Sequence, residues 1–457
     1  MRFVNRKNEL AALERWWAAA DPRPALVWGR RRVGKTALLQ RFAEGRRGIF
    51  FTGSGRPERG ELAAFHRRIT EVFPDEWRLD GSHTDWERTF DYLADLARDE
   101  PLLVVLDEFP ELMSSSPALP GILRAFLDRQ RETKLRLVLC GSSVRTMWQM
   151  QEYRAPLYGR FDLTMQLHPF RPHEAAEMLP EINSADRALA YGILGGMPLY
   201  LDLWNQSASV ADNLLELVGL PTSRLLTEGE LILATELDHS DHARATLFAI
   251  AHGKTRFHEI ADAIGADPAR ALRNLISLRL VERIMPVTET ERRTRLRIYR
   301  ICDNFLAFYL NVATRYIPEI ERGMGNDILP AMVDALSDHM GAVYEEAFRW
   351  HLRRLAGKGE LGDRVVAVGP WWREGGQDQI DAVVLAQPER SRIPVLVGEC
   401  KWARSVNAVR IKTDLTVKAG NLVESPGELR YAVCARDEVV NPDPYTLAIT
   451  AADIFAP

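Results

Sequence analysis

The chain has 457 residues, and its 59 basic and 63 acidic side chains leave a formal net charge of −4. Hydrophobic residues make up 46% and charged residues 27% of the sequence, which is typical of a globular protein and excludes a disordered or collagen-like chain. The nearly neutral balance also excludes a basic protein that coats nucleic acid. At about 150 residues per domain, this length predicts roughly three domains.

The cysteines and the apolar runs indicate where the protein resides. Cys140, Cys302, Cys400 and Cys434 are widely spaced and form no CxxC pair, which argues against a zinc ribbon or a disulfide framework and favours a reducing compartment. The first residues, MRFVNRKNEL, lack the apolar core of a signal peptide. The uncharged run at 188–201 is too short to span a bilayer. We therefore expect a cytoplasmic protein without a membrane partner.

Residues 1–205 alternate apolar runs with amphipathic helical patterns. Nearly continuous apolar strands separated by helices predict a parallel sheet that is covered on both faces, and hence an α/β domain. The predicted strands are 25–28, 48–52, 102–107, 135–140 and 161–167.

The segment at 29–36, GRRRVGKT, matches the phosphate-binding pattern GxxxxGK[ST], follows an apolar strand and opens a helix. Glycines let main-chain amides turn toward phosphate oxygens, and the helix N-terminus adds partial positive charge. We expect Lys35 to reach the β- and γ-phosphates and the Thr36 hydroxyl to bind Mg²⁺. The predicted nucleotide contacts are Gly29, Val33, Gly34, Lys35, Thr36 and Ala37.

An acidic pair, Asp107 and Glu108, follows the apolar run LLVVL. We predict that its strand lies beside the first strand, where Asp107 holds Mg²⁺ through water and Glu108 polarises the attacking water. An acidic pair after a strand is often a simple helix cap, but its coupling to an upstream phosphate loop favours catalysis. The next apolar run ends in LCGSS, so Ser142 or Ser143 is a candidate sensor of the γ-phosphate.

These segments resemble the prokaryotic P-loop ATPases of the AAA+/STAND type, often called the archaeal-type ATPase family. FVNRKNEL (3–10) resembles the N-terminal box of that family, LDEFPEL its Walker B motif and LCGSS its sensor strand. The resemblance implies that LGGMP (194–198) is a turn that places Pro198 against adenine. It also makes Arg160, in PLYGRFD, a candidate sensor or trans-acting arginine finger, with a structural salt bridge as an equal alternative.

Residues 206–317 lose the strand pattern and become helical. The patterns at 245–253, 257–265 and 267–281 predict three short helices, and 282–301 predicts a hairpin. This order is typical of a winged helix-turn-helix domain.

The predicted wing is rich in arginine, which is the electrostatic footprint of a protein that binds duplex DNA. In STAND-type ATPases, however, the winged helix frequently packs on the nucleotide domain and senses its state, so both interpretations stay open. The arginines of the wing are Arg283, Arg292, Arg293, Arg295, Arg297 and Arg300, and the third helix adds Arg270, Arg273 and Arg279.

Residues 318–457 are predicted to form a third, α/β unit that opens with a helix at 341–355. Short strands are predicted at 380–386, at 393–399 and around 430–434. The intervening stretch, RVVAVGPWWREGGQDQ, is interpreted as turn-rich.

Asp381 and the pair Glu399 and Lys401 lie on the two adjacent predicted strands. Because side chains at i and i+2 share one face of a strand, Glu399 and Lys401 are expected to project together toward Asp381. Two carboxylates can hold Mg²⁺ against a scissile phosphate while a lysine orients the attacking water. Glu345, on the preceding helix, is the natural supporting acid.

This pattern resembles the PD-(D/E)XK phosphodiesterases. WWREGGQDQIDAVVL and VGECKW also resemble a C-terminal domain of unknown function that accompanies such ATPases and is related to restriction endonucleases. Gln379 departs from the pattern, since glutamate commonly precedes the Ile-Asp pair. Many relatives of this fold serve as binding or scaffold modules, so cleavage and an inert scaffold both stay open.

Together these patterns predict an ATP-hydrolysing switch of three parts: a P-loop ATPase domain at 1–205, a helical region with a winged helix at 206–317 and a nuclease-like domain at 318–457. ATP and Mg²⁺ are the expected cofactors. Double-stranded DNA is the partner expected for the winged helix and the C-terminal domain, and a nucleotide-dependent homo-oligomer is left open. The alternatives are a DNA-binding regulatory or signalling ATPase and a protein-interaction scaffold, each with an inert C-terminal domain.

Overall fold

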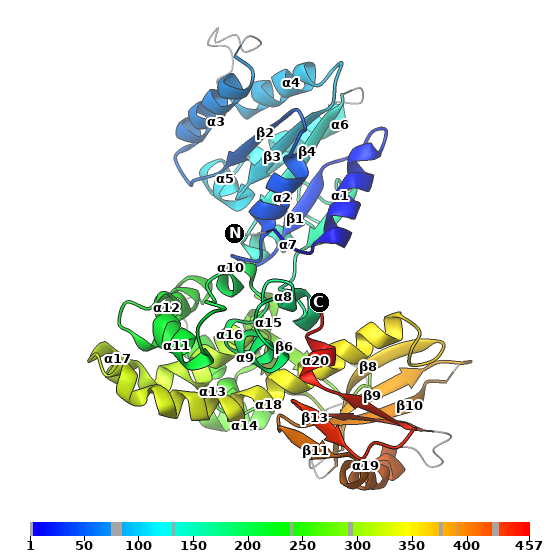
Figure 1. Ribbon diagram of the computed structural model, residues 1–457. Helices are drawn as coiled ribbons and strands as arrows, with labels where there is room; N and C mark the ends of the chain where they lie inside the picture. The colour runs from blue at the N-terminus through cyan, green and yellow to red at the C-terminus, as the bar shows by residue number, and fades with distance from the viewer. Residues whose placement is uncertain are drawn as a thin grey trace. The chain divides into compact units, whose positions relative to one another are not determined.

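The computed structural model describes residues 3–74, 85–129, 133–237, 241–290, 296–373, 378–389, 391–422 and 429–457. The chain divides into two compact units, residues 1–169 and 170–457 (Figure 1). In the described part of the chain, no helix is both long and apolar enough to cross a bilayer.

The first unit is built on a parallel sheet with the strand order β2-β3-β4-β1-β5. Every residue of β1, β3 and β4 is buried, as expected for a sheet with helices on both faces. The five predicted strands are confirmed. Their bounds are β1 (Ala25–Trp28), β2 (Gly48–Thr52), β3 (Leu102–Asp107), β4 (Leu135–Gly141) and β5 (Leu163–Gln166).

One expectation about this sheet is wrong. Strand β3, which carries Asp107, does not lie beside β1, because β4 is inserted between them. The carboxyl ends of the three strands still meet at one edge, since Trp28 is paired with Gly141 and Leu106 with Leu139.

Helices complete the first unit. On one face, Leu102, Val104 and Leu106 of β3 pack against an aromatic cluster contributed by α3, α4 and α6. Adjacent rings of this cluster, those of Phe65 and Trp86, lie 5.9 Å apart. The helices are α1 (Lys7–Ala18), α2 (Lys35–Ala43), α3 (Glu58–Val72), α4 (Trp86–Leu96), α5 (Phe109–Ser115), α6 (Leu119–Arg129) and α7 (Val144–Gln149).

The second unit begins with helices. Helix α13 packs against both α14 and α15, and a short antiparallel hairpin of β6 and β7 follows, in the order that the sequence predicts. The bounds are α8 (Pro172–Ala176), α9 (Ser184–Leu194), α10 (Pro198–Leu201), α11 (Val210–Leu214), the π-helical turn η1 (Leu215–Gly219), α12 (Arg224–Glu236), α13 (Asp241–Ala251), α14 (Phe257–Ile264), α15 (Ala269–Ser277), β6 (Val281–Ile284), β7 (Ile298–Ile301), α16 (Asn304–Asn311), the 3₁₀ turn η2 (Ala313–Tyr316) and α17 (Ile317–Glu321).

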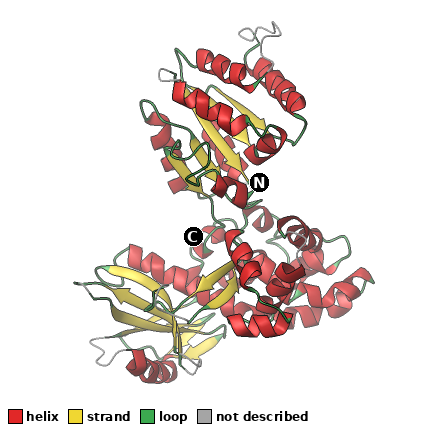
Figure 2. Ribbon diagram, turned by 180° about the vertical axis from the view of Figure 1, so that it is seen from behind, coloured by secondary structure: helices red, strands yellow, loops and turns green. Residues whose placement is uncertain are grey.

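A mixed sheet with the order β14-β12-β10-β9-β8 forms the other half of the second unit (Figure 2). Strands β8, β9 and β10 are antiparallel, and β10, β12 and β14 are parallel. The remaining elements are α18 (Gly325–Gly357), β8 (Val365–Trp372), β9 (Gln379–Ala386), β10 (Ile393–Cys400), β11 (Ser405–Asn407), α19 (Ala408–Leu422), β12 (Arg430–Cys434), β13 (Glu438–Val440), β14 (Thr446–Ile449) and α20 (Ala451–Ile454); β11 and β13 pair in parallel apart from the main sheet.

Strand β8 corrects the interpretation of 364–379 as turn-rich. It is an edge strand of the sheet, and five of its eight residues are not fully buried. An edge strand tolerates Gly369 and Pro370. Because both residue types are typical of turns, they made the segment resemble a loop in the sequence.

The 33-residue helix α18 joins the two halves of the second unit. Its residues Tyr344 and Phe348 share a core with Ala188 of α9 and Ala382 of β9. The chain end closes the same core, because the ring of Phe455 lies 5.7 Å from that of Tyr191. Helices α8 to α10, which we expected to complete the ATPase domain at residue 205, therefore pack with the second unit.

Gly196, in the LGGMP segment, illustrates how tight this packing is. A Cβ atom at Gly196 would lie 2.0 Å from the main-chain oxygen of Phe170. We expect Gly196→Ala to lower the free energy of unfolding of the second unit by at least about 2 kcal/mol, because a backbone cannot yield as a side chain can. Denaturant unfolding measures this change. Gly420→Ala, in α19 with no atom within 4 Å, is the control and is expected to stabilise by about 0.5–1 kcal/mol.

Candidate functional site

The segment at 29–36 forms a loop between β1 and α2. A Cβ at Gly29 would lie 2.5 Å from the oxygen of Leu167, and Gly34 has a left-handed φ of 92°, so both glycines are required by the backbone. The ammonium of Lys35 is buried beneath the loop and donates to the main-chain oxygens of Gly29 and Arg30 at 2.9 and 3.0 Å. The loop thus encloses a cation at the N-terminus of a helix.

The next side chain, Thr36, meets the acidic residue at the end of β3. Its hydroxyl donates to Oδ2 of Asp107 at 2.9 Å, and Oδ1 of Asp107 accepts the main-chain N–H of Glu108 at 3.0 Å. A hydroxyl and a carboxylate this close are hard oxygen donors of the kind that Mg²⁺ prefers, so the residues fit that ion. Asp107 is also hydrogen-bonded by the thiol of Cys140, and burial together with the charge of Asp107 raises the pKa of that thiol.

Burial lowers the pKa of Lys35, although the nearby Glu108 and Asp107 oppose the shift. A buried ammonium is unfavourable until an anion joins it. A phosphate group in the loop would supply that anion, so the site favours a polyphosphate ligand.

Glu108 adopts a left-handed φ of 49°, which is uncommon for a residue other than glycine and is concentrated at functional sites. Its Oε2 accepts hydrogen bonds from the main-chain N–H of Ser142 at 3.1 Å and from the hydroxyl of Ser142 at 2.9 Å. Of the two serines that the sequence leaves open, Ser142 thus contacts the acid. Ser143 instead caps α7 by accepting from the N–H of Thr146.

Arg6 is a contributor that the sequence reasoning missed. This buried side chain donates to the main-chain oxygens of Val33 and His168, at 3.0 and 2.8 Å, and so fastens the phosphate loop. It also pairs with Glu9. The only available signal was its place in the segment 3–10, which resembles the N-terminal box of the ATPase family.

The other predicted nucleotide contacts fall in both units. Val33 is buried in the loop, and Ala37 is partly buried in the first turn of α2. Pro198 is the first residue of α10 and belongs to the second unit, where it is buried.

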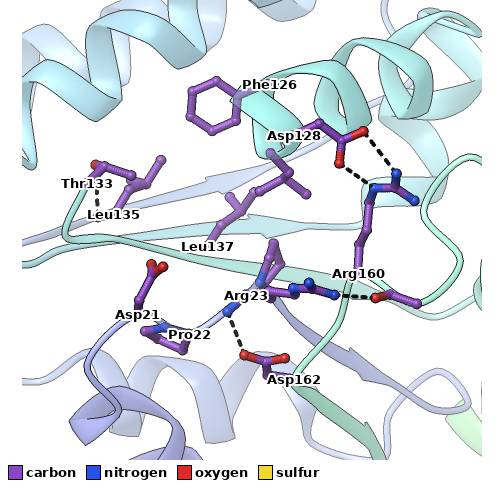
Figure 3. A pocket seen from close by; sticks show the side chains of 13 residues that line it. Asp21, Pro22, Arg23, Phe126, Asp128, Thr133, Leu135, Leu137, Arg160 and Asp162 are labelled. Carbon is purple, nitrogen blue, oxygen red and sulfur yellow. Dashed lines mark hydrogen bonds and ion pairs between the residues drawn. The ribbon is translucent and has the colours of Figure 1, made fainter. Parts of the chain in front are cut away.

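Arg160 does not join the Lys35 group of its own chain. It lies at the opposite, amino-terminal edge of the sheet, beside a pocket of about 730 Å³ (Figure 3). There its guanidinium forms a two-point ion pair with Asp128, at 3.0 and 2.9 Å. The structural salt bridge is thus the role seen within this chain, and the trans-acting finger stays a prediction about an assembly.

A second cluster of charged side chains lies in the mixed sheet. Asp381 on β9 and Glu399 on β10 are nearly buried and lie on paired strands. Glu399 binds two lysines, with its Oε1 2.7 Å from Nζ of Lys401 and its Oε2 3.2 Å from Nζ of Lys418. Lys418 lies on α19 and was missed; the available signal was its rarity, since the chain has only eight lysines.

Asp381 has a different environment from Glu399. Its Oδ2 accepts the main-chain N–H of Cys400 at 2.9 Å, and within the described residues no ion pair reaches its carboxylate. Burial, and then the charges of Glu345 and Glu399, raise the pKa of Asp381 to about 7. Burial likewise raises the pKa of Glu345.

The cluster has the donor chemistry for a divalent cation, because mutually repelling carboxylates would be neutralised by one. However, among the residues that the structure covers, no three His, Cys, Asp or Glu side chains are already gathered closely enough to hold a metal ion. The two lysines at Glu399 take the place of that positive charge.

The raised pKa of Asp381 gives a prediction for stability. An acid whose pKa is higher in the folded than in the unfolded chain binds more protons when folded, so stability falls as pH rises between about 4 and 7. In EDTA, we expect the melting temperature of the second unit to decline over this range and Asp381→Asn to weaken the decline. Calorimetry at pH 5 and pH 8 checks this, and equal declines in both proteins would contradict it.

The described arginines of the hairpin differ in their exposure: Arg283 is exposed, whereas Arg300 is partly buried. Arg300 pairs with Glu282 and lies 3.1 Å from Glu346, so it is committed within the protein. Arg270, Arg273 and Arg279 on and after α15 are exposed. Arg292, Arg293 and Arg295 lie outside the described residues.

The fold and the loop of the first unit resemble those of P-loop ATPase domains of the archaeal type. Residues 3–203 match the family model described as an ATPase domain predominantly from Archaea. Residues 309–412 match a family of archaeal and bacterial proteins of unknown function.

The chain is also similar to two curated proteins and to one solved structure. An uncharacterized protein of Methanocaldococcus jannaschii is 28% identical over 441 residues, which cover 95% of each chain. An uncharacterized ATP-binding protein of the same organism is 49% identical over 45 residues, or 10% of this chain and 76% of that protein. A Walker-type ATPase of Pyrococcus abyssi has a similar structure, with a TM-score of 0.53 and 21% identity over 68% of this chain and 96% of that one.

Proposed function

We propose that this protein is a Mg²⁺-dependent ATPase whose nucleotide state regulates the second unit. The observation that carries the proposal is the convergence of Lys35, Thr36, Asp107 and Glu108 at one edge of the parallel sheet. Asp107 accepts hydrogen bonds from the Thr36 hydroxyl at 2.9 Å and from the main-chain N–H of Glu108 at 3.0 Å, and Lys35 is held by the main-chain oxygens of the loop. The family match of residues 3–203 supports it.

The residues divide the work of hydrolysis among them. Main-chain amides of the loop and the ammonium of Lys35 bind the phosphate oxygens and stabilise charge as the γ-phosphate leaves. Thr36 and Asp107 would hold Mg²⁺, which neutralises phosphate charge when bound. Glu108 orients and polarises a water molecule in line with the γ-phosphate. Ser142 holds Glu108 through two hydrogen bonds and would act as the sensor of that phosphate.

Removing the ammonium tests the proposal. We expect Lys35→Ala to lower the rate of ATP hydrolysis by at least about 100-fold, because a preorganised charge aimed at the reacting phosphate is lost. Phosphate release by the full chain with Mg²⁺ measures it. Lys134→Ala, which removes an exposed lysine of the same unit, is the control and should leave the rate unchanged. Equal hydrolysis by the Lys35 variant and the parent would refute the assignment.

A second candidate activity is metal-dependent cleavage of nucleic acid by the second unit. It is favoured by the placement of Asp381 and Glu399 on paired strands, with Lys401 just after the second strand and bound to Glu399. The order α18, β8, β9, β10, α19, β12 with three antiparallel strands joined to a parallel one supports a nuclease-like fold of the PD-(D/E)XK type. Asp381 and Glu399 would hold Mg²⁺, which activates water and neutralises the phosphate when bound. Lys401 would orient the attacking water, and Glu345 would serve as the supporting acid.

Duplex DNA is the partner that the α13–α15 helices and the β6–β7 hairpin support, as a winged helix, through the exposed arginines at α15. The alternative is a regulatory ATPase or scaffold in which the acidic cluster is inert. Salt-dependent binding of a DNA duplex, weakened by Arg273→Glu, would support the DNA partner. An ATP-dependent change in assembly mass without DNA affinity would support the scaffold.

A further inference from the structure

The β6–β7 hairpin is attached to the sheet that carries the acidic cluster. The main-chain N–H of Val287, in the hairpin loop, donates to the oxygen of Pro370 on β8 at 2.8 Å. The side chain of Val287 packs against the apolar cluster that contains Trp371 and Ile380. The hairpin therefore rests on the edge strand, next to β9.

A chain of ion pairs continues from the hairpin into helix α18. Glu282 and Arg300 are paired residues of β6 and β7, joined by a hydrogen bond of 2.9 Å. Arg300 also lies 3.1 Å from Oε2 of Glu346, and the same oxygen accepts from Nε of Arg349 at 2.8 Å. Arg353 holds the other oxygen of Glu346 at 2.8 Å and reaches the oxygen of Val368 on β8.

The chain of ion pairs ends at the acidic cluster. Nη1 of Arg349, which is almost completely buried, donates to the main-chain oxygen of Asp381 at 2.7 Å and lies 3.7 Å from Oε2 of Glu345. Burial alone would raise the pKa of Glu346, but Arg300, Arg349 and Arg353 outweigh it and bring that pKa to about 2. Glu346 is therefore a fixed anion that orients Arg349 against the strand of Asp381.

We propose that Arg300 of the hairpin is a positioning residue for the acidic cluster, acting through Glu346 and Arg349 on the backbone that carries Asp381. A bridging guanidinium can hold two carboxylates in fixed directions, whereas an ammonium cannot. Displacement of the hairpin would withdraw Arg300 from Glu346 and loosen the hold of Glu346 on Arg349, so the hairpin would act on the site through these two residues. The inference rests on the proposed metal-dependent function of Asp381.

The test measures the binding of Mn²⁺ to the full-length protein by calorimetry, without nucleotide. The heat measured with Asp381→Asn is subtracted, so that Mn²⁺ bound elsewhere in the protein does not count. Positioning predicts that Arg300→Met and Glu346→Gln both weaken Mn²⁺ binding, by about 3- to 30-fold each. Simple electrostatics predicts opposite effects, because the first variant removes a positive charge and the second a negative one. The double variant should bind no more weakly than the worse single variant, since both act through one network.

Controls separate the outcomes. Arg322→Met removes an arginine from an exposed pair with Glu319 in the same unit and should bind Mn²⁺ like the parent. Arg300→Lys keeps the positive charge and should bind Mn²⁺ with an affinity between those of the parent and Arg300→Met. The melting temperature of each variant shows whether it is folded. If Arg300→Met matches the control or binds more tightly, the positioning role is refuted and the metal site stands. If Asp381→Asn binds Mn²⁺ like the parent, the proposed metal site fails, and the positioning role fails with it.

Discussion

Glu108→Gln is expected to reduce ATP hydrolysis by about 100- to 10,000-fold while ATP binding persists, because the amide keeps the size of the side chain but cannot accept a proton from water. The proposed role rests on geometry, since the left-handed backbone of Glu108 and two hydrogen bonds from Ser142 hold its carboxylate just after the end of β3. Single-turnover phosphate release and equilibrium binding of a fluorescent ATP analogue separate the two effects.

Glu111→Gln is the matched control for this variant. Glu111 is exposed in the first turn of α5, three residues after Glu108. The Glu111→Gln variant should therefore hydrolyse ATP at the parental rate. A Glu108 variant that retained more than about one tenth of the rate would show that another group activates the water.

Asp381→Ala is expected to reduce metal-dependent nicking of supercoiled plasmid by at least about 100-fold while ATP hydrolysis stays at the parental rate. Asp381 is nearly buried beside Glu345 and Glu399, and in the described part of the chain no ion pair reaches its carboxylate. A bound divalent cation would therefore relieve the repulsion among these acids. Agarose gels after incubation with Mg²⁺ or Mn²⁺, with and without ATP, measure it.

Asp414→Ala, in an exposed position on α19, is the control for the plasmid assay and should nick like the parent. Intact plasmid in every lane would mean that Asp381, Glu399 and Lys401 are a structural cluster. Adding Lys35→Ala to the same experiment shows whether nucleotide controls the cleavage.

The parallel sheet and its phosphate loop could be predicted because their signals are local. Each strand of the first unit is a short, largely apolar run, and GRRRVGKT contains five of the predicted nucleotide contacts within eight residues. The strand order could not be predicted, since the insertion of β4 between β1 and β3 depends on contacts between distant segments. Thr36 and Asp107 were each predicted to bind Mg²⁺, and the structure brings them within hydrogen-bond distance even though their strands are not neighbours.

The missed features are long-range or partly exposed. Strand β8 has a mixed burial pattern and contains Gly369 and Pro370, so no alternation marks it. Lys418 reaches Glu399 from a helix 19 residues away, and Arg300 reaches Glu346 from 46 residues away, so neither contact leaves a motif. The number of arginines in the hairpin shows that the segment is basic, but it does not show which way each side chain points. Arg300 points into an ion-pair network within the protein.

The packing of helix α9 against the end of the chain has a consequence for synthesis. Arg187 of α9 donates to the main-chain oxygen of Phe455, a partner 268 residues later in the sequence. At about 5–20 residues per second, a ribosome needs on the order of 10–50 s to make that stretch. During this interval the first unit can fold, whereas the apolar side chains of α9 that pack against the end of the chain remain exposed to solvent. A chain that ends early, for instance after residue 203, would keep that apolar surface permanently exposed.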